Sequence, residues 1–201
     1  MLKELSAKFY EKIKKFLKHE DIIDIILFGS SVRGKEFFED IDILVIYSKK
    51  NDELEYKVRK ELEKADKRVK TVSKIYTEIF SPEFSAREAI LSEGFSLKNK
   101  KFIAEGLGYQ PLRLFRYYLK GLNQSRRMQF YYSLHGRGSQ KGLLEKAHAY
   151  KFSEGIILAE VENSEIIKEF FEKLKMQYEE FPVIIPKRIF KFKISKKQNE
   201  Y

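Results

Sequence analysis

One stretch, from Ile25 to Ile46, constrains the fold of this chain more than any other. It reads IILFGSSVRGKEFFEDIDILVI, in which two apolar runs are separated by a Gly-Ser step and a polar spacer. Asp40 and Asp42 open the second run, and residues two positions apart on a strand point to the same side of a sheet. Because the residues that follow are apolar on both faces, the pattern predicts a buried strand that carries a pair of carboxylates.

The carboxylate pair and the Gly-Ser step together indicate phosphate chemistry. Two like charges are costly to bury unless a cation neutralises them, and carboxylate oxygens suit Mg²⁺ or Mn²⁺. Gly29 allows close approach of the backbone, and Ser30 adds a hydroxyl, as in a phosphate-binding cradle. A metal held between carboxylates and phosphate oxygens is typical of phosphoryl or nucleotidyl transfer. A simple turn or helix cap is the alternative for each motif, and the apolar flanks favour the site.

The run LFGSSVRG followed by DIDILV resembles the signature of the DNA polymerase β-like nucleotidyltransferase superfamily, and most resembles its small prokaryotic, minimal nucleotidyltransferase members. The resemblance covers about residues 1–95. It implies an α/β (α+β) nucleotidyltransferase fold, with a small mixed sheet flanked by helices. It also implies that Gly29 and Ser30 bind the triphosphate and that Asp40 and Asp42 ligate magnesium. Small relatives of this kind are often partnered with a separate helical, nuclease-like protein, as the antitoxin of a toxin pair.

Two further residues are candidates for this site. In the family a third carboxylate comes from a later strand, and the alternating residues from Val69 to Phe80 predict such a strand. Glu78 is the acidic residue in it and therefore the candidate third catalytic carboxylate, although the family more often has Asp there; an exposed strand Glu is the alternative. Arg33 is a candidate phosphate ligand, with an exposed loop arginine as the alternative.

Composition excludes several classes of protein. The chain has no cysteine, so it has neither a disulfide framework nor a thiolate zinc site, and its three His residues show no ligand spacing. No run of about 18 apolar residues is present, and the N-terminus has the pattern of a charged amphipathic helix rather than a signal peptide. We therefore expect a cytoplasmic protein without a membrane partner.

The second half of the chain differs in charge from the first. Residues 98–151 hold twelve Lys or Arg and two Glu, which equals the formal net charge of +10 of the whole chain. Such a segment favours a polyanionic partner, RNA or another nucleic acid. We predict helices at about 111–122 and 125–134, with nucleic-acid contacts along them from Arg113, Arg116, Lys120, Arg126 and Arg127, and with Tyr117, Tyr118 or Tyr131 free to stack on bases.

The predicted organisation is therefore a catalytic domain at 1–95, a second small basic, helix-rich α+β domain at 96–192 and a frayed basic tail at 193–201. The predicted function is a metal-dependent nucleotidyltransferase that moves a nucleoside monophosphate from an NTP, with ATP preferred, to an acceptor hydroxyl and releases pyrophosphate. RNA, a protein side chain and a small molecule all stay open as the acceptor. The alternative is a non-catalytic nucleotide-binding or nucleic-acid-binding regulatory module, such as an antitoxin with a helical partner protein.

Overall fold

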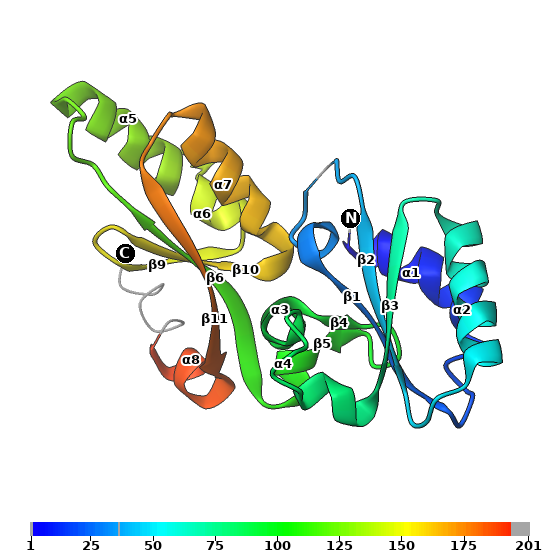
Figure 1. Cartoon of the computed structure of the whole chain (residues 1–201). Helices are drawn as coiled ribbons and strands as arrows, with labels where there is room; N and C mark the ends of the chain where they lie inside the picture. The colour runs from blue at the N-terminus through cyan, green and yellow to red at the C-terminus, as the bar shows by residue number, and fades with distance from the viewer. Residues whose placement is uncertain (1, 36, 194–201) are drawn as a thin grey trace. The chain divides into compact units, whose positions relative to one another are not determined.

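The computed structural model describes residues 2–35 and 37–193, and the chain divides into two compact units, Met1–Leu107 and Gly108–Tyr201. Each unit has its own β-sheet (Figure 1). None of the helices in the part of the chain that the structure describes has the length and apolar content that crossing a membrane requires.

The first unit alternates helices and short strands. Its elements in chain order are α1 (Leu2–Ile13), β1 (Ile22–Phe28), the 3₁₀-helix η1 (Gly29–Val32), β2 (Ile41–Tyr47), α2 (Asp52–Ala65), β3 (Val69–Ile75), the 3₁₀-helix η2 (Tyr76–Phe80), α3 (Arg87–Glu93), β4 (Phe95–Ser96), β5 (Lys101–Phe102) and α4 (Ile103–Gly106).

The sheet of the first unit is mixed, with strand order β3-β2-β1-β4-β5. The strands β1 and β2 are antiparallel, whereas β2 and β3 are parallel and are connected by helix α2. This helix begins where Asn51 accepts a hydrogen bond from the backbone N–H of Leu54, a side-chain cap that satisfies one free donor of the first turn. The predicted small mixed sheet flanked by helices is confirmed.

Both faces of the central strands are buried. On one face Ile26, Leu44 and Ile46 pack with Phe84 and Ile90, which come from α3 and the loop before it. The alternate residues of β2 are equally buried on the opposite face. Figure 1 shows α1 and α2 side by side near the sheet. A strand buried on both faces explains why IDILVIY is a continuous apolar run after its aspartate.

The third strand is shorter than the predicted one. It ends at Ile75, and the residues that follow form η2. The Glu78 carboxylate accepts a hydrogen bond of 2.8 Å from the backbone N–H of Ile75, so it caps the turn that ends the strand. The prediction of a strand from Val69 to Phe80 was wrong over its last five residues because a local side-chain bond replaces the ladder there.

The first unit also extends further than the predicted boundary at residue 95. Strand β4 pairs with β1 through Leu27 and Phe95, and β5 pairs with β4. Residues 96–107 therefore belong to the first unit, in which they complete the sheet and add helix α4. The predicted tail at 193–201 lies outside the described residues except for its first position.

The second unit contains a sheet covered by helices. Its elements are β6 (Tyr109–Tyr117), α5 (Gln124–His135), β7 (Gly136–Arg137), β8 (Gln140–Lys141), α6 (Leu143–Lys146), β9 (Ala149–Ser153), β10 (Ile156–Glu160), the 3₁₀-helix η3 (Val161–Asn163), α7 (Ser164–Lys173), β11 (Tyr178–Pro186) and α8 (Lys187–Lys193). The four-stranded sheet is antiparallel with order β11-β6-β10-β9, and β7 pairs with β8 in a small hairpin.

Two apolar clusters flank the four-stranded sheet. Phe115 and Tyr117 of β6 pack with Phe130 of α5 and Phe171 of α7, and the ring centroids of Tyr117 and Phe130 are 5.1 Å apart. The other cluster contains Leu112 and Leu158, with side chains from β9, β11 and α8 around them. The sheet is therefore apolar on both faces over its central strands.

This double burial explains an incorrect prediction. The sequence pattern favoured a helix over residues 111–122, whereas most of it is strand β6. Apolar residues occur on both sides of a strand that is buried twice, so their spacing includes the three- and four-residue intervals expected of a helix. The predicted helix at 125–134 is confirmed as α5.

Candidate functional site

The candidate site lies where β1 ends and β2 begins. Phe28, the last residue of β1, is paired with Asp42 in the sheet register, so the turn that follows β1 starts beside that carboxylate. Gly29 has a φ of +75°, a region that side chains rarely adopt. A Cβ on Gly29 would lie 2.6 Å from Asp42 Oδ2. Glycine is therefore required here for two reasons: the backbone conformation at this position and the close contact with the Asp42 carboxylate.

The two serines after Gly29 differ in role. Ser31 is buried, and its hydroxyl donates to the Phe28 carbonyl at 3.2 Å, which holds the turn against the end of β1. The Ser30 side chain is partly exposed and makes no hydrogen bond to any residue that the structure describes. Of the two, Ser30 has the hydroxyl that is available to a ligand.

The two aspartates lie at the start of β2. Asp40 is in the loop just before the strand, and its side chain is 41% exposed. Asp42 is within the strand. Burial raises the pKa of Asp42 above its ordinary value, the negative charge of Asp40 raises it further, and the Lys70 ammonium acts in the opposite direction. Two carboxylates this close repel each other, which is the reason that Asp40 raises the pKa of Asp42.

A lysine stands beside this pair. Lys70 of β3 is in register with Asp42 on β2, and its Nζ lies 2.6 Å from Asp40 Oδ2. Lys70 was not among the predicted site residues, because the resemblance implies a carboxylate from this strand. Alternation places Lys70 on one face of its strand with Val72 and Lys74, but only the pairing of β3 with β2 brings it opposite Asp42.

Glu78 does not join the site. Its carboxylate is turned to its own backbone in η2, where it accepts from the Ile75 N–H. The positions of β3 that face the same side as Asp42 are occupied by Lys70, Val72 and Lys74. The place predicted for a third carboxylate is therefore basic.

Arg33 is held by a buried acid. Its Nε and Nη2 donate to the two oxygens of Glu93 at 2.9 and 3.0 Å. Glu93, the last residue of α3, is 3% exposed. This bidentate ion pair joins the loop after η1 to α3. Arg33 therefore has a structural partner within the fold, and its role as a phosphate ligand stays a prediction.

The Asp40–Asp42 pair suits a hard divalent cation such as Mg²⁺. Within residues 2–35 and 37–193, no three acidic, His or Cys side chains gather into a metal site. Mg²⁺ in nucleotide sites, however, is usually held by one or two carboxylates and completed by substrate phosphates and water. Asp40 and Asp42 supply those carboxylates, and their mutual repulsion is the condition that a cation relieves.

The predicted nucleic-acid residues do not share one surface. Arg113 is 8% exposed and forms an ion pair with Glu180 at 2.6 Å. Arg116 lies three residues further on the same strand and so on the opposite face, where it pairs with Glu179 at 3.5 Å. The prediction that Arg113 and Arg116 lie along a helix was wrong because β6 is a strand.

The predicted stacking residues are also divided. Tyr117 is 5% exposed and belongs to the core, whereas Tyr131 on α5 is 51% exposed. Arg126 is exposed on the same helix and makes no ion pair with a described residue, as is also true of Lys120 in the preceding loop. The basic and aromatic surface that remains is therefore on α5.

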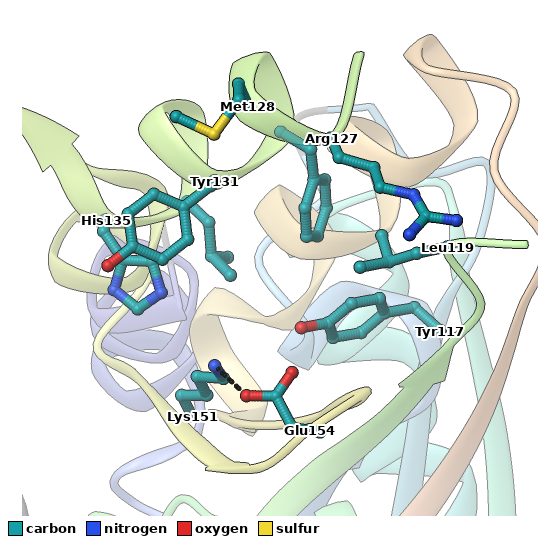
Figure 2. A pocket seen from close by; sticks show the side chains of 10 residues that line it. Tyr117, Leu119, Arg127, Met128, Tyr131, His135, Lys151 and Glu154 are labelled. Atoms are coloured by element: carbon teal, nitrogen blue, oxygen red, sulfur yellow. Dashed lines mark hydrogen bonds and ion pairs between the residues drawn. The ribbon is translucent and has the colours of Figure 1, made fainter. Parts of the chain in front are cut away.

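A shallow pocket lies under this helix. Figure 2 shows it between α5, the end of β6 and the β9–β10 hairpin, with Arg127, Tyr131 and His135 on the helix side. Lys151 and Glu154 close the opposite side with an ion pair of 2.6 Å. The rings of Tyr131 and His135 are 4.5 Å apart, and burial is the main cause that lowers the pKa of His135.

Comparisons with known proteins identify the first unit. Residues 11–101 match the family model described as polymerase beta, nucleotidyltransferase. No curated protein matches the chain. A chain in a solved structure of a tri-AMPylated HEPN toxin from Shewanella oneidensis in complex with an MNT antitoxin is similar, with 18% identity, 48% of this chain and 71% of that chain covered, and a TM-score of 0.34.

The fold and the family match define a class of protein. The first unit contains a nucleotidyltransferase-type domain of the DNA polymerase β-like superfamily, over the segment 11–101. The matched segment contains the Gly-Ser turn, both aspartates and Lys70, and it ends within β5.

Proposed function

We propose that the first unit binds a magnesium–NTP complex and transfers the nucleoside monophosphate to an acceptor hydroxyl, with release of pyrophosphate. ATP is the proposed nucleotide. The observation that carries the proposal is the contact between Gly29 and Asp42, because it joins a turn with open backbone to a carboxylate of the acidic pair.

Each residue of the site has a separate task in this proposal. Gly29, which has no side chain, lets phosphate oxygens approach the backbone of the turn, and the Ser30 hydroxyl donates to one of them. Asp40 and Asp42 would hold the metal. When bound, Mg²⁺ supplies positive charge to the phosphate oxygens and orients the leaving pyrophosphate.

The second unit is proposed to bind the acceptor. The supporting observation is that Lys120, Arg126, Arg127 and Tyr131 are exposed, whereas Arg113 and Tyr117 are buried and Arg116 is paired with Glu179. Aromatic rings and cations on one surface suit unpaired bases of RNA, since stacking tolerates any base. RNA is therefore the proposed acceptor class.

The test is a pyrophosphate-release assay with each of the four NTPs and Mg²⁺, with and without RNA. We expect release with ATP for the wild type, none for Asp42→Asn, and wild-type release for Asp52→Asn. Asp52 is the matched control because it is an aspartate 80% exposed at the start of α2, outside the site. Equal release by Asp42→Asn and wild type would reject the site.

A second candidate is a regulatory module that binds nucleotide without turnover, such as an antitoxin with a helical partner protein. Two observations favour it: the Lys70–Asp40 ion pair at the acidic pair, and the position of Glu78 in η2. Calorimetry separates the two candidates. Magnesium–ATP binding that Asp42→Asn abolishes, together with no pyrophosphate release from any NTP and acceptor, would select the regulatory module.

A further inference from the structure

Lys70 is the cation that the fold itself places at the acidic pair. The parallel register of β2 and β3 sets it opposite Asp42, and its ammonium is 2.6 Å from the Asp40 carboxylate. Two carboxylates at i and i+2 need a counter-charge, and this ammonium supplies one without a metal.

The position of Lys70 leaves it free to change partners. Strand β3 is at the edge of the sheet, and the Lys70 side chain is 64% exposed. An exposed ion pair of this kind is weak, because water competes for both charges. A divalent ion that binds Asp40 and Asp42 would meet the ammonium at the same oxygen and would have to displace it.

We propose that Lys70 is a resident counter-ion that competes with the divalent metal for Asp40. It makes the metal affinity of the free protein low, so that metal binds mainly together with the phosphates of the nucleotide. After displacement the ammonium stays beside the site and can pair with a phosphate oxygen instead of Asp40. This inference rests on the proposed function for the nucleotide, but the competition itself involves only the metal and this chain.

The chain offers a matched control for Lys70. Lys74 is on the same strand and the same face, four residues further along, and its Nζ lies 5.8 Å from the centre of the Phe84 ring rather than at the acidic pair. Loss of the Lys74 charge changes the net charge of the protein equally. It therefore separates a general electrostatic effect from displacement at Asp40.

The experiment is a titration of the full chain with Mn²⁺ in the absence of nucleotide, followed by electron paramagnetic resonance of the free ion. We expect Lys70→Gln to bind Mn²⁺ on the order of tenfold more tightly than the wild type, the gain expected when a unit charge a few ångströms from a divalent ion in water is removed. Lys70→Arg and Lys74→Gln should bind like the wild type. Asp40→Asn in the Lys70→Gln background should lose the gain.

Equal Mn²⁺ affinity for Lys70→Gln and the wild type, with the fold intact by circular dichroism, would overturn the inference, as would an equal gain for Lys74→Gln. A second measurement uses the wild type alone: Mg²⁺ should shift the NMR signals of the Lys70 ε-methylene and leave those of Lys74 in place. Shifts at neither lysine on saturation would also overturn it. Failure of the proposed function gives a different result, namely a gain in Mn²⁺ affinity for Lys70→Gln but no ATP binding by any variant.

Discussion

The backbone of Gly29 lies against the carboxylate of Asp42, so closely that a Cβ at position 29 would be 2.6 Å from Oδ2. The turn after β1 and the acidic residue inside β2 are therefore in direct contact. A change in the turn must move the carboxylate, and this coupling gives the first prediction.

Gly29→Ala should lower stability and abolish nucleotide binding. The φ of +75° costs an alanine about 1–2 kcal/mol, and the contact with Asp42 displaces the carboxylate as well. Gly121→Ala is the control, since Gly121 has a φ of +87°, a Cβ added there would meet no atom within 4 Å, and it lies in the other unit. Urea unfolding should show that backbone strain lowers the free energy of unfolding in both variants. ATP calorimetry should show that binding is lost in Gly29→Ala alone.

Arg33→Met should destabilise the protein by roughly 3 kcal/mol, because it removes two hydrogen bonds that compensate the buried Glu93 carboxylate. The double variant Arg33→Met with Glu93→Gln should recover part of that loss, since the second change also removes the buried charge. Free energies of unfolding from a double-mutant cycle measure the coupling. Additive losses in the double variant would show that the pair contributes no coupling energy.

Arg126→Glu with Arg127→Glu should weaken RNA binding and flatten its dependence on salt, because each phosphate contact releases counterions. The same pair of changes at Arg59 and Lys60 on α2 alters the net charge equally and is the control. Affinity measured by fluorescence anisotropy over a range of salt should fall steeply for the wild type and the control. A flat response for the wild type would mean that α5 makes no phosphate contacts.

The stability of the first unit should fall in acid through Asp66. Its carboxylate pairs with Arg68 at 2.8 Å and Lys8 at 2.9 Å, and the arginine hydrogen bond is the main cause that holds its pKa below the ordinary value of 3.8. A lowered folded-state pKa adds stability that is present above the ordinary carboxyl range and is lost as the pH falls through the folded-state pKa. Asp66→Asn should therefore be less stable than the wild type at neutral pH, and the difference should shrink below about pH 4.

Denaturant unfolding of both proteins across that pH range checks the sign. A difference between wild type and Asp66→Asn that grows in acid would contradict the assigned direction of the shift. A difference that does not depend on pH would mean that the Asp66 charge is equally stabilised in the unfolded chain.

The sequence predicted the parts of the first unit that rest on local pattern. The apolar runs on either side of the Gly-Ser step form β1 and β2, and the match of residues 11–101 to the superfamily confirms the resemblance. The distance from Gly29 to Asp42 could not be predicted, since it follows from the pairing of Phe28 with Asp42 across two strands.

Features that depend on strand register, or on the burial of both faces of a strand, could not be predicted from the sequence. Lys70 comes to Asp42 through a parallel pairing whose register no motif records. The change from helix to strand at 111–122 has a similar origin, because apolar residues on both faces of β6 hide its period of two. Arg113 and Arg116 then separate onto opposite faces, which a helix would have kept together.

The pairing of β4 with β1 has a practical consequence for anyone who divides this chain. A fragment cut at residue 95 would remove Ser96, one of the two residues of β4, together with all of β5, and would expose the edge of the IIDIILF strand β1. An exposed apolar edge is a template for pairing with other molecules, so such a fragment should aggregate. A fragment that continues to Leu107 keeps β4, β5 and α4, so it is the fragment of the first unit to express.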